Sequence, residues 1–214
     1  MSFSAVGKVW DVTGLADYVG GIRSLSWADS VTVHHTGTPD LSQRPQGWKI
    51  QHMRNLAHFY GKQLGWSAGP HLFTDEDQIF GLSPLTAPGV HARSFNRSSI
   101  GIEMLGNFDK DDPESGRGAE VLRTSIECVA ALLNKLGLEA SEETILFHRD
   151  DPKTTKTCPG GKVGKLWFVS EVARAMEGRE EESDPTTEPN DENGDLAECI
   201  KAMEWQLHKL KSLI

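Results

Sequence analysis

The stretch Ser30–His35, SVTVHH, joins a run of β-branched residues to two histidines. β-branched side chains fit a pleated, buried strand, so the stretch predicts a short strand whose end carries ionisable groups. A second stretch, Ser99–Leu105 (SIGIEML), is largely apolar apart from Glu103 and predicts a central strand. These two segments indicate a sheet, and they place imidazole and carboxylate groups next to apolar surroundings.

Outward from these strands, strand and helix patterns alternate along the chain. Three segments have apolar residues at helical spacing: Trp48–Trp66, Glu120–Leu136 and Val163–Met176. Three short segments are strand-like: His71–Thr74, Gln78–Leu82 and Thr144–Phe147. Gly137 follows the second helical segment as its expected C-cap. The predicted fold class is α/β, with helices packed on a sheet.

The net charge of −9 belongs mainly to one segment of the chain. Residues 177–195 hold nine acidic side chains and one arginine, so the residues before them are close to neutral. A near-neutral domain has no basic footprint for nucleic acid. No apolar run approaches the roughly 18 residues that a membrane span needs. Met1–Gly14 lacks the pattern of a secretory signal, so we expect synthesis in the cytoplasm and delivery by another route.

Composition divides the chain into a main domain over residues 1–176, an acidic linker over 177–194 and a helix over 195–214. The linker has two prolines and no large apolar residue, so it cannot bury enough surface to fold alone. The last segment has a heptad pattern of apolar residues: Leu196, Ile200, Met203, Leu207, Leu210 and Ile214. We expect this stripe to form a homo-oligomer, most simply a coiled-coil dimer. Docking onto the main domain and binding to a membrane surface are the alternatives.

Three residues outside the core patterns indicate a metal site. His34 ends one predicted strand, His148 follows another, and Cys158 stands in the segment KTCPG. Each residue alone is a weak signal, since a histidine at a strand end is more often an ordinary polar cap. Together they supply two imidazoles and a thiolate, which suit zinc. Three protein ligands leave a fourth position for water, which is the arrangement of catalytic rather than structural zinc.

Two further residues complete the requirements of a hydrolytic site. Burial of Glu103 in its apolar strand would raise the pKa of the carboxyl group, as a proton-shuttling base requires. Lys156 lies two residues before Cys158, so in an extended segment both side chains point the same way. Its ammonium group would then reach a developing oxyanion. A solvent-facing glutamate and a solvated loop lysine are the simpler alternatives.

Four segments together resemble a known family. VTVHHTGTP, GPHLF, GVHARSFNRSSIGIEMLGNFD and FHRDDPKTTKTCPGG, in this order over roughly residues 30–168, are similar to the zinc N-acetylmuramoyl-L-alanine amidases. That group includes phage lysis amidases, anhydro-muramyl amidases and peptidoglycan recognition proteins. The resemblance implies a central mixed β-sheet flanked by helices, and it makes the main domain over residues 1–176 the catalytic domain. It also implies one zinc ion per chain, bacterial peptidoglycan as the partner, and hydrolysis of the bond between N-acetylmuramic acid and L-alanine.

The resemblance assigns roles to individual positions. It implies that His34, His148 and Cys158 are the metal ligands and that Glu103 and Lys156 are catalytic. His35, the neighbour of the first ligand, is not expected to bind metal because alternate strand residues face opposite ways.

Two positions carry expectations about substrate, and one departs from the family. The resemblance implies that His91 and Asn96 contact substrate. Some phage relatives have a catalytic tyrosine in a Gly-Tyr-His segment where this chain has Pro70. Proline has no acid–base group, so a tyrosine mechanism at that position is excluded.

Three functions remain open at this point. The enzyme is favoured because Cys158, Glu103 and Lys156 are all present. A non-enzymatic peptidoglycan receptor of the same fold and a structural zinc module built around the C-terminal helix are the alternatives. If the protein is an amidase, we expect a phage-type endolysin that reaches the cell wall through holin-type release or another route. A cytoplasmic muropeptide-recycling amidase and an injected antibacterial effector are the other roles.

Overall fold

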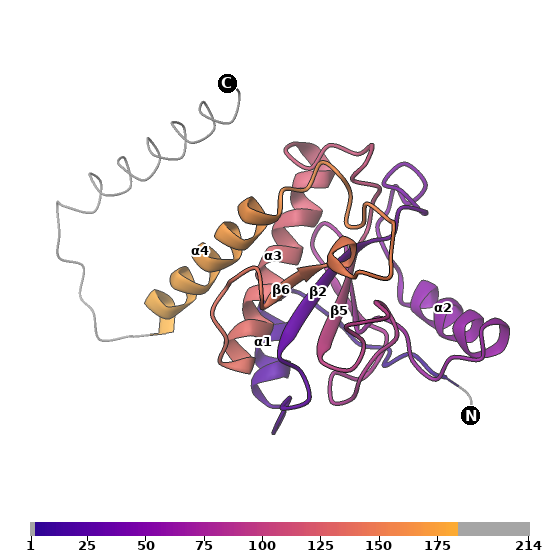
Figure 1. Cartoon of the computed structure of the whole chain (residues 1–214), viewed down its shortest axis with the longest axis horizontal. Coiled ribbons are helices and arrows are strands. Elements are labelled where there is room, and N and C mark those ends of the chain that lie inside the picture. Colours follow the sequence, from indigo (N-terminus) through magenta and orange to yellow (C-terminus); the bar gives the residue numbers. More distant parts are fainter. Residues whose placement is uncertain (1–2, 184–214) are drawn as a thin grey trace. The chain divides into compact units, whose positions relative to one another are not determined.

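A mixed sheet of six strands lies at the centre of this computed structural model, which describes residues 3–183 (Figure 1). The strands are β1 (Val9–Trp10), β2 (Ser30–His35), β3 (Leu72–Thr74), β4 (Ile79–Gly81), β5 (Ser99–Met104) and β6 (Ile145–Phe147). Their order across the sheet is β1-β4-β3-β5-β2-β6. Strands β3, β5, β2 and β6 are parallel to one another, whereas β4 pairs antiparallel with β1 and β3. The predicted α/β class, a central mixed sheet flanked by helices, is confirmed.

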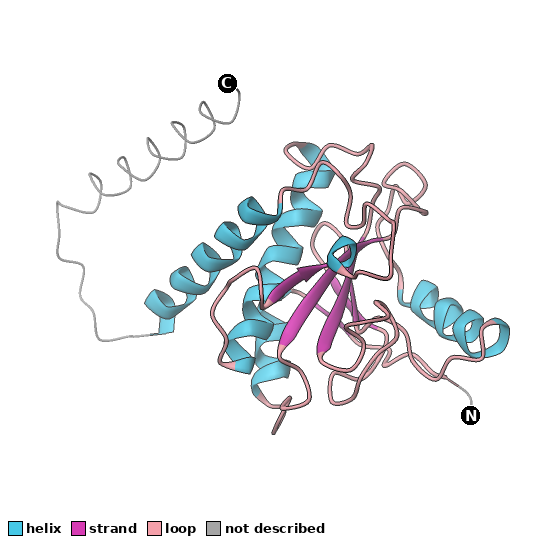
Figure 2. Cartoon of the chain, in the orientation of Figure 1, coloured by secondary structure: helices cyan, strands magenta, loops and turns pink. Residues whose placement is uncertain are grey.

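The two faces of the sheet are covered by different helices (Figure 2). Residues 3–183 form four α-helices: α1 (Val12–Gly20), α2 (Ile50–Gln63), α3 (Gly116–Leu136) and α4 (Lys165–Ser183). Side chains of α1, α3 and α4 join one large apolar core with the sheet, and side chains of α2 join a smaller one. Figure 1 shows α2 apart from the other three helices. The sheet therefore has apolar packing on both of its faces.

Alternation along β2 and β5 separates an apolar face from a polar one. Val31 and Val33 of β2 belong to the large core, together with Ile100 and Ile102 of β5. The intervening residues face the other way because successive strand side chains alternate. In the parallel register, His34 lies directly opposite Glu103. The pattern that builds the core thus also sets an imidazole beside a carboxylate on the opposite face.

Two elements of the fold were missed by sequence reasoning. Helix α1 is short and contains Gly14 and Gly20, and glycine weakens the helical signal. Its start is stabilised by the side chain of Asp11, which accepts a hydrogen bond from the backbone of Gly14 at 2.7 Å. Strand β1 has two residues, too few for a period to be recognised. Their existence depends on tertiary packing rather than on local pattern.

Other differences concern the ends of helices. Helix α3 begins at Gly116, four residues before the predicted start, and ends at Leu136. Gly137 follows it with a φ of 66°, which is the predicted left-handed cap. Helix α4 continues to Ser183 and so enters the segment predicted as a linker from residue 177. Glutamate and arginine are good helix formers, which explains the extension. The remainder of that linker and the predicted helix over 195–214 lie outside the described residues. None of the helices in residues 3–183 is long and apolar enough to cross a membrane.

Candidate active site

Three side chains converge at the carboxyl end of the central strands. His34 lies near the end of β2, and His148 opens the 3₁₀ turn His148–Asp150 that follows β6, the parallel neighbour of β2. Parallel neighbouring strands end at the same edge of the sheet, so the two imidazoles lie close together there. Cys158 comes from the following loop. The potential ligand atoms of these three residues all lie within 4.8 Å of one another, and the sequence prediction that they form one cluster is met.

The spacing of the donor atoms fits a zinc ion. His34 Nδ1 lies 3.0 Å from His148 Nδ1 and 3.7 Å from Cys158 Sγ. Tetrahedral zinc, with bonds of about 2.05 Å to nitrogen and about 2.3 Å to sulfur, would separate such pairs by about 3.3 and about 3.6 Å. Two imidazoles and one thiol also form a donor set that zinc prefers. The residues present therefore fit the metal that the sequence predicts.

The surroundings of Cys158 favour a thiolate only when a cation is near. Burial raises the pKa of the Cys158 thiol, and the neighbouring Glu103 raises it further. In the opposite sense, the backbone N–H of His35 donates to Sγ at 3.3 Å. A coordinating metal deprotonates such a thiol. Without a nearby cation, these surroundings favour the neutral thiol of Cys158.

Glu103 lies beside this cluster, as the register of β2 and β5 requires. Its Oε1 is 3.9 Å from His34 Nδ1, and the side chain is 17% exposed. Burial raises the pKa of the Glu103 carboxyl to about 8, although the charge of Lys156 lowers it in part. A carboxyl group with a pKa near neutrality can both accept and return a proton. Glu103 therefore has the position and the proton affinity of a general base.

Lys156 is exposed and lines the same groove. Burial lowers the pKa of His148, and the positive charge of Lys156 lowers it further; Lys156 also adds to the lowering of the His34 pKa, after burial and the neighbouring histidines. The ammonium group is therefore close enough to act electrostatically on the cluster. This placement is the one that stabilisation of a negative charge on a substrate would require.

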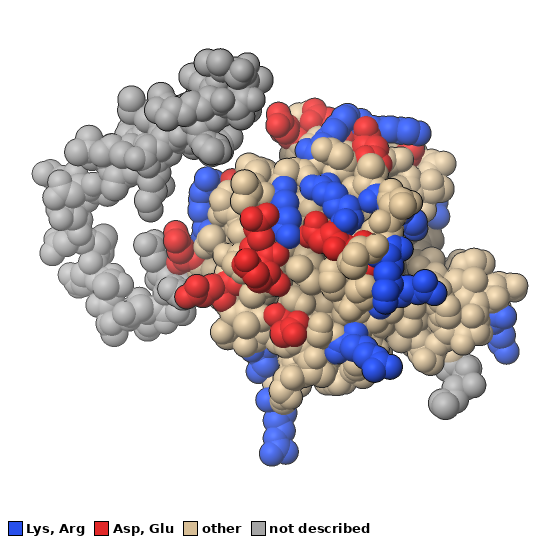
Figure 3. All heavy atoms as spheres, in the orientation of Figure 1, with Lys and Arg blue, Asp and Glu red and all other residues tan. Residues whose placement is uncertain are grey.

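A groove of about 730 Å³ surrounds these residues. Its size lies within the range of roughly 300–1,000 Å³ typical of ligand sites. One part is aromatic and is lined by Trp48, Tyr60, Trp66 and Phe73. Another part is polar and is lined by Asn107, Asp109, Thr155 and Thr157. Basic and acidic side chains are interspersed over the face of the molecule drawn in Figure 3, so no charge of one sign dominates there.

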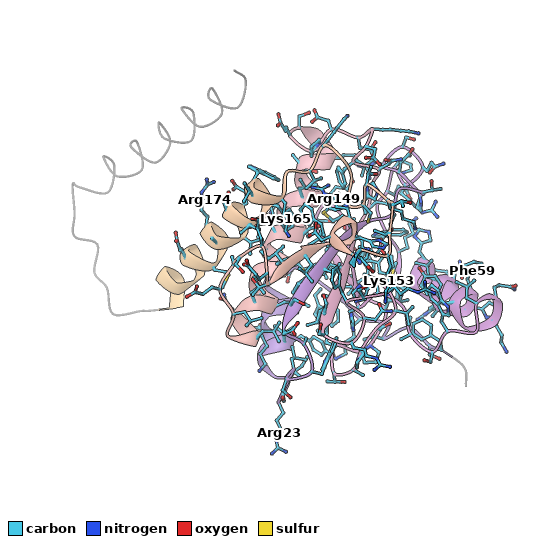
Figure 4. All side chains as sticks on the ribbon, viewed as in Figure 1. Arg23, Phe59, Arg149, Lys153, Lys165 and Arg174 are labelled. Atoms are coloured by element: carbon cyan, nitrogen blue, oxygen red, sulfur yellow. The ribbon has the colours of Figure 1, made fainter. Side chains whose placement is uncertain are left out.

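Two charged residues brace the loop that carries Cys158. Arg149, labelled beside β6 in Figure 4, donates to the carbonyls of Gly160 at 2.9 Å and Val163 at 2.8 Å. Its backbone N–H also donates to the carbonyl of Cys158 at 2.8 Å. Asp151 accepts two hydrogen bonds from Ser94 and so ties this loop to the one that carries His91. The cluster is thus held in place by hydrogen bonds between loops as well as by the strands.

The two residues predicted to contact substrate have other partners. His91 lines the groove, but its ring nitrogens lie within hydrogen-bond distance of His34 Nε2 and of the Ser99 carbonyl. Burial lowers the pKa of His91 to about 3. Asn96 is not among the lining residues, and its Oδ1 accepts from the backbone N–H groups of His91 and Ala92. Both side chains form hydrogen bonds with other groups of the protein, and a motif match does not show such bonds.

Other residues of the groove agree with or extend the sequence analysis. His35 is outside the three-residue cluster, as predicted, and its Nδ1 accepts from the backbone of Phe108 at 3.0 Å. Tyr60, within the helix predicted over Trp48–Trp66, also lines the groove, and burial raises the pKa of its phenol. Helical spacing identifies the inward face of α2, but it does not show that part of this face borders a cavity.

Comparison with known proteins gives relatives of two kinds. A peptidoglycan recognition protein of Bombyx mori is 32% identical over 100 residues, which are 46% of this chain and 50% of that protein. The chain thus matches about half the length of this curated relative.

Solved structures show the same fold at lower identity. An endolysin amidase, LysCS, of Clostridium intestinale matches with a TM-score of 0.52 and 23% identity over 68% of this chain and 84% of that one. A mutant endolysin from Bacillus subtilis matches with a TM-score of 0.50 and 24% identity over 68% and 86%. The sequence profile described as N-acetylmuramoyl-L-alanine amidase matches residues 25–161, which is more than half of the chain and includes every predicted site residue. The chain therefore belongs to the N-acetylmuramoyl-L-alanine amidase family.

Proposed function

We propose that this protein hydrolyses the amide bond between N-acetylmuramic acid and L-alanine in bacterial peptidoglycan, using one zinc ion held by His34, His148 and Cys158. The observation that carries the proposal is the convergence of these three donors within 4.8 Å, with Glu103 Oε1 3.9 Å from His34 Nδ1. A metal ligand set with a carboxyl group beside it is what metal-assisted hydrolysis needs. Family membership supports the choice of bond.

The residues of the chain divide the chemical work. When bound, zinc would supply a Lewis acid for the scissile carbonyl and activate water as the nucleophile. Glu103 accepts the proton of the attacking water and returns it to the nitrogen of L-alanine as the C–N bond breaks. Lys156 stabilises the negative charge that develops on the carbonyl oxygen. The groove holds the polymer so that the amide lies between these groups.

Lys156→Met tests the assignment of the oxyanion donor. Methionine keeps much of the length of the side chain but has no charge and no N–H donor. We expect kcat to fall roughly 10²–10³-fold, as for the loss of one oxyanion donor, with zinc content unchanged. Lys153→Met, in the same loop but outside the groove-lining set, is the matched control and should keep its activity. Equal rates in the two variants would remove Lys156 from the mechanism.

A second candidate function is binding of peptidoglycan without cleavage. The similarity to a peptidoglycan recognition protein favours it over other non-enzymatic functions. The two functions are separated by incubating purified protein with isolated cell walls and measuring sedimentation with the walls together with loss of turbidity. A receptor would sediment with the walls and leave the turbidity unchanged. The amidase proposed here would clear the suspension, and removal of zinc by a chelator would stop the clearing.

Among amidases, we propose the role of a phage-type endolysin rather than a recycling enzyme or an effector. The acidic linker and heptad segment that follow the catalytic domain are typical of a modular lysin and support this role. The comparison to make is between polymeric cell walls and soluble muropeptides as substrates. An endolysin should cleave the polymer at least as efficiently as the fragments. A strong preference for soluble fragments would favour the recycling role.

A further inference from the structure

A continuous chain of hydrogen bonds connects the backbone of β5 to His34. The Nε2 atom of His91 lies 3.0 Å from the carbonyl oxygen of Ser99, the first residue of β5. The Nδ1 atom of the same ring lies 3.1 Å from Nε2 of His34. The two imidazoles meet edge to face, with an interplanar angle of 88°. His91 thus bridges a fixed carbonyl and the far side of a proposed metal ligand.

The carbonyl determines where each proton of this chain lies. A carbonyl oxygen only accepts hydrogen bonds, so His91 Nε2 must carry a proton and donate it to Ser99. Within residues 3–183 no carboxylate is hydrogen-bonded to this buried ring, so the ring is neutral and its Nδ1 is an acceptor. His34 Nε2 must then carry a proton and donate it to His91. The lone pair of neutral His34 is consequently on Nδ1, the atom that faces His148 and Cys158.

The position of the His91 ring depends on two local features, the space beside Gly101 and a hydrogen bond from the backbone of His91 to Asn96. A Cβ atom added to Gly101 would lie 2.5 Å from His91 Cγ, so only glycine at this point of β5 leaves room for the imidazole. Asn96 Oδ1 also accepts the backbone N–H of His91 at 2.8 Å, which holds the backbone that carries the ring. The ring is therefore positioned by a strand and by a local side-chain bond at the same time.

We infer that His91 is a positioning residue that fixes the tautomer and the orientation of His34, so that the Nδ1 lone pair of His34 points at the metal. This inference rests on the zinc site of the proposed function. Metal-binding histidines generally donate their second N–H to a carbonyl, a carboxylate or a water, which orients the ring and strengthens the ligand. Here a second histidine, itself tied to a carbonyl, performs that task. The same bonds leave His91 no free nitrogen with which to bind substrate.

Zinc affinity measures this role without reference to catalysis. The dissociation constant is measured by competition with a fluorescent zinc chelator at constant pH. We expect His91→Ala to weaken zinc binding about 10–100-fold, the usual effect of removing a partner of a metal ligand. His91→Asn should retain tighter binding than His91→Ala, because its Oδ1 takes the place of Nδ1 as acceptor. Gly101→Ala should weaken binding by displacing the ring, and His58→Ala, on the exposed face of α2, should leave it unchanged.

Unchanged zinc affinity in His91→Ala would overturn the inference while leaving the proposed function intact. A wild-type protein that binds no zinc would contradict the proposed function, and the inference with it. Should His91→Ala fail to fold, nitrogen NMR of the zinc-loaded wild type decides the matter. The inference requires protons on Nε2 of both His34 and His91. A proton on Nδ1 of His91 would overturn it.

Discussion

His34→Ala and Cys158→Ala are each expected to abolish zinc binding and amide hydrolysis together. Each change leaves only two of the three donors that converge within 4.8 Å. Two remaining donors cannot supply the three protein ligands that catalytic zinc sites typically have. Alanine has no donor atom and is smaller than the histidine or cysteine that it replaces, so water enters the space that is left. The measurement is zinc per chain by elemental analysis, with clearing of isolated cell walls followed on the same samples.

Matched substitutions separate loss of the metal from loss of the fold. Cys128→Ala removes a second buried thiol, in helix α3 and outside the groove, and should keep about one zinc per chain. His58→Ala removes an exposed histidine from α2 and should also keep the metal. Circular dichroism checks that all variants are folded. Full zinc content and full activity in Cys158→Ala would show that the ligand assignment is wrong.

Glu103→Gln is expected to slow hydrolysis by about 10²–10⁴-fold, the usual contribution of a general acid–base residue. Glutamine keeps the shape of the side chain and can still form hydrogen bonds. However, glutamine cannot accept the proton of the attacking water. The Glu103 carboxyl group can, because burial raises its pKa to about 8. The fall should be in kcat, because the substrate contacts of the groove remain. Steady-state kinetics on a soluble muropeptide would give kcat and KM separately.

The zinc content of Glu103→Gln distinguishes a base from a metal ligand. Because Glu103 Oε1 lies 3.9 Å from His34 Nδ1, the carboxylate is near the metal position without belonging to the cluster of three. The variant should therefore keep its zinc while losing rate. Glu171→Gln, on helix α4 and outside the groove, is the control and should behave as wild type. Near-normal turnover in Glu103→Gln would remove the residue from the mechanism.

The parts of the fold that the sequence predicts are those with a strong local period. Strand β2 and helix α2 were predicted because β-branched runs and helical spacing are visible in short windows. The ligands were predicted because few residue types bind zinc and because the segments that carry them resemble one family. The meeting of His34 with Glu103 depends on the parallel pairing of β2 with β5, which no single segment encodes.

The parts that could not be predicted depend on contacts between distant segments. Helix α1 forms although its two glycines weaken the local signal. The role of His91 depends on the carbonyl of Ser99 and on the space above Gly101, neither of which a motif contains. Asn96 matched a family position, yet its amide serves the backbone of its own loop. A sequence motif identifies which residues gather at a site, whereas hydrogen bonds decide what each of them does there.

The bond that is cut is the most direct test of the proposed function. Purified cell walls are digested with the wild-type protein, and the released products are identified by mass spectrometry beside a digest with Glu103→Gln. The wild type should release free stem peptides that begin with L-alanine and leave glycan strands whose N-acetylmuramic acid carries a free carboxyl group. The variant should release far less of both. Products cut within the glycan or within the peptide, or walls that bind the protein and stay intact, would contradict the proposed amidase.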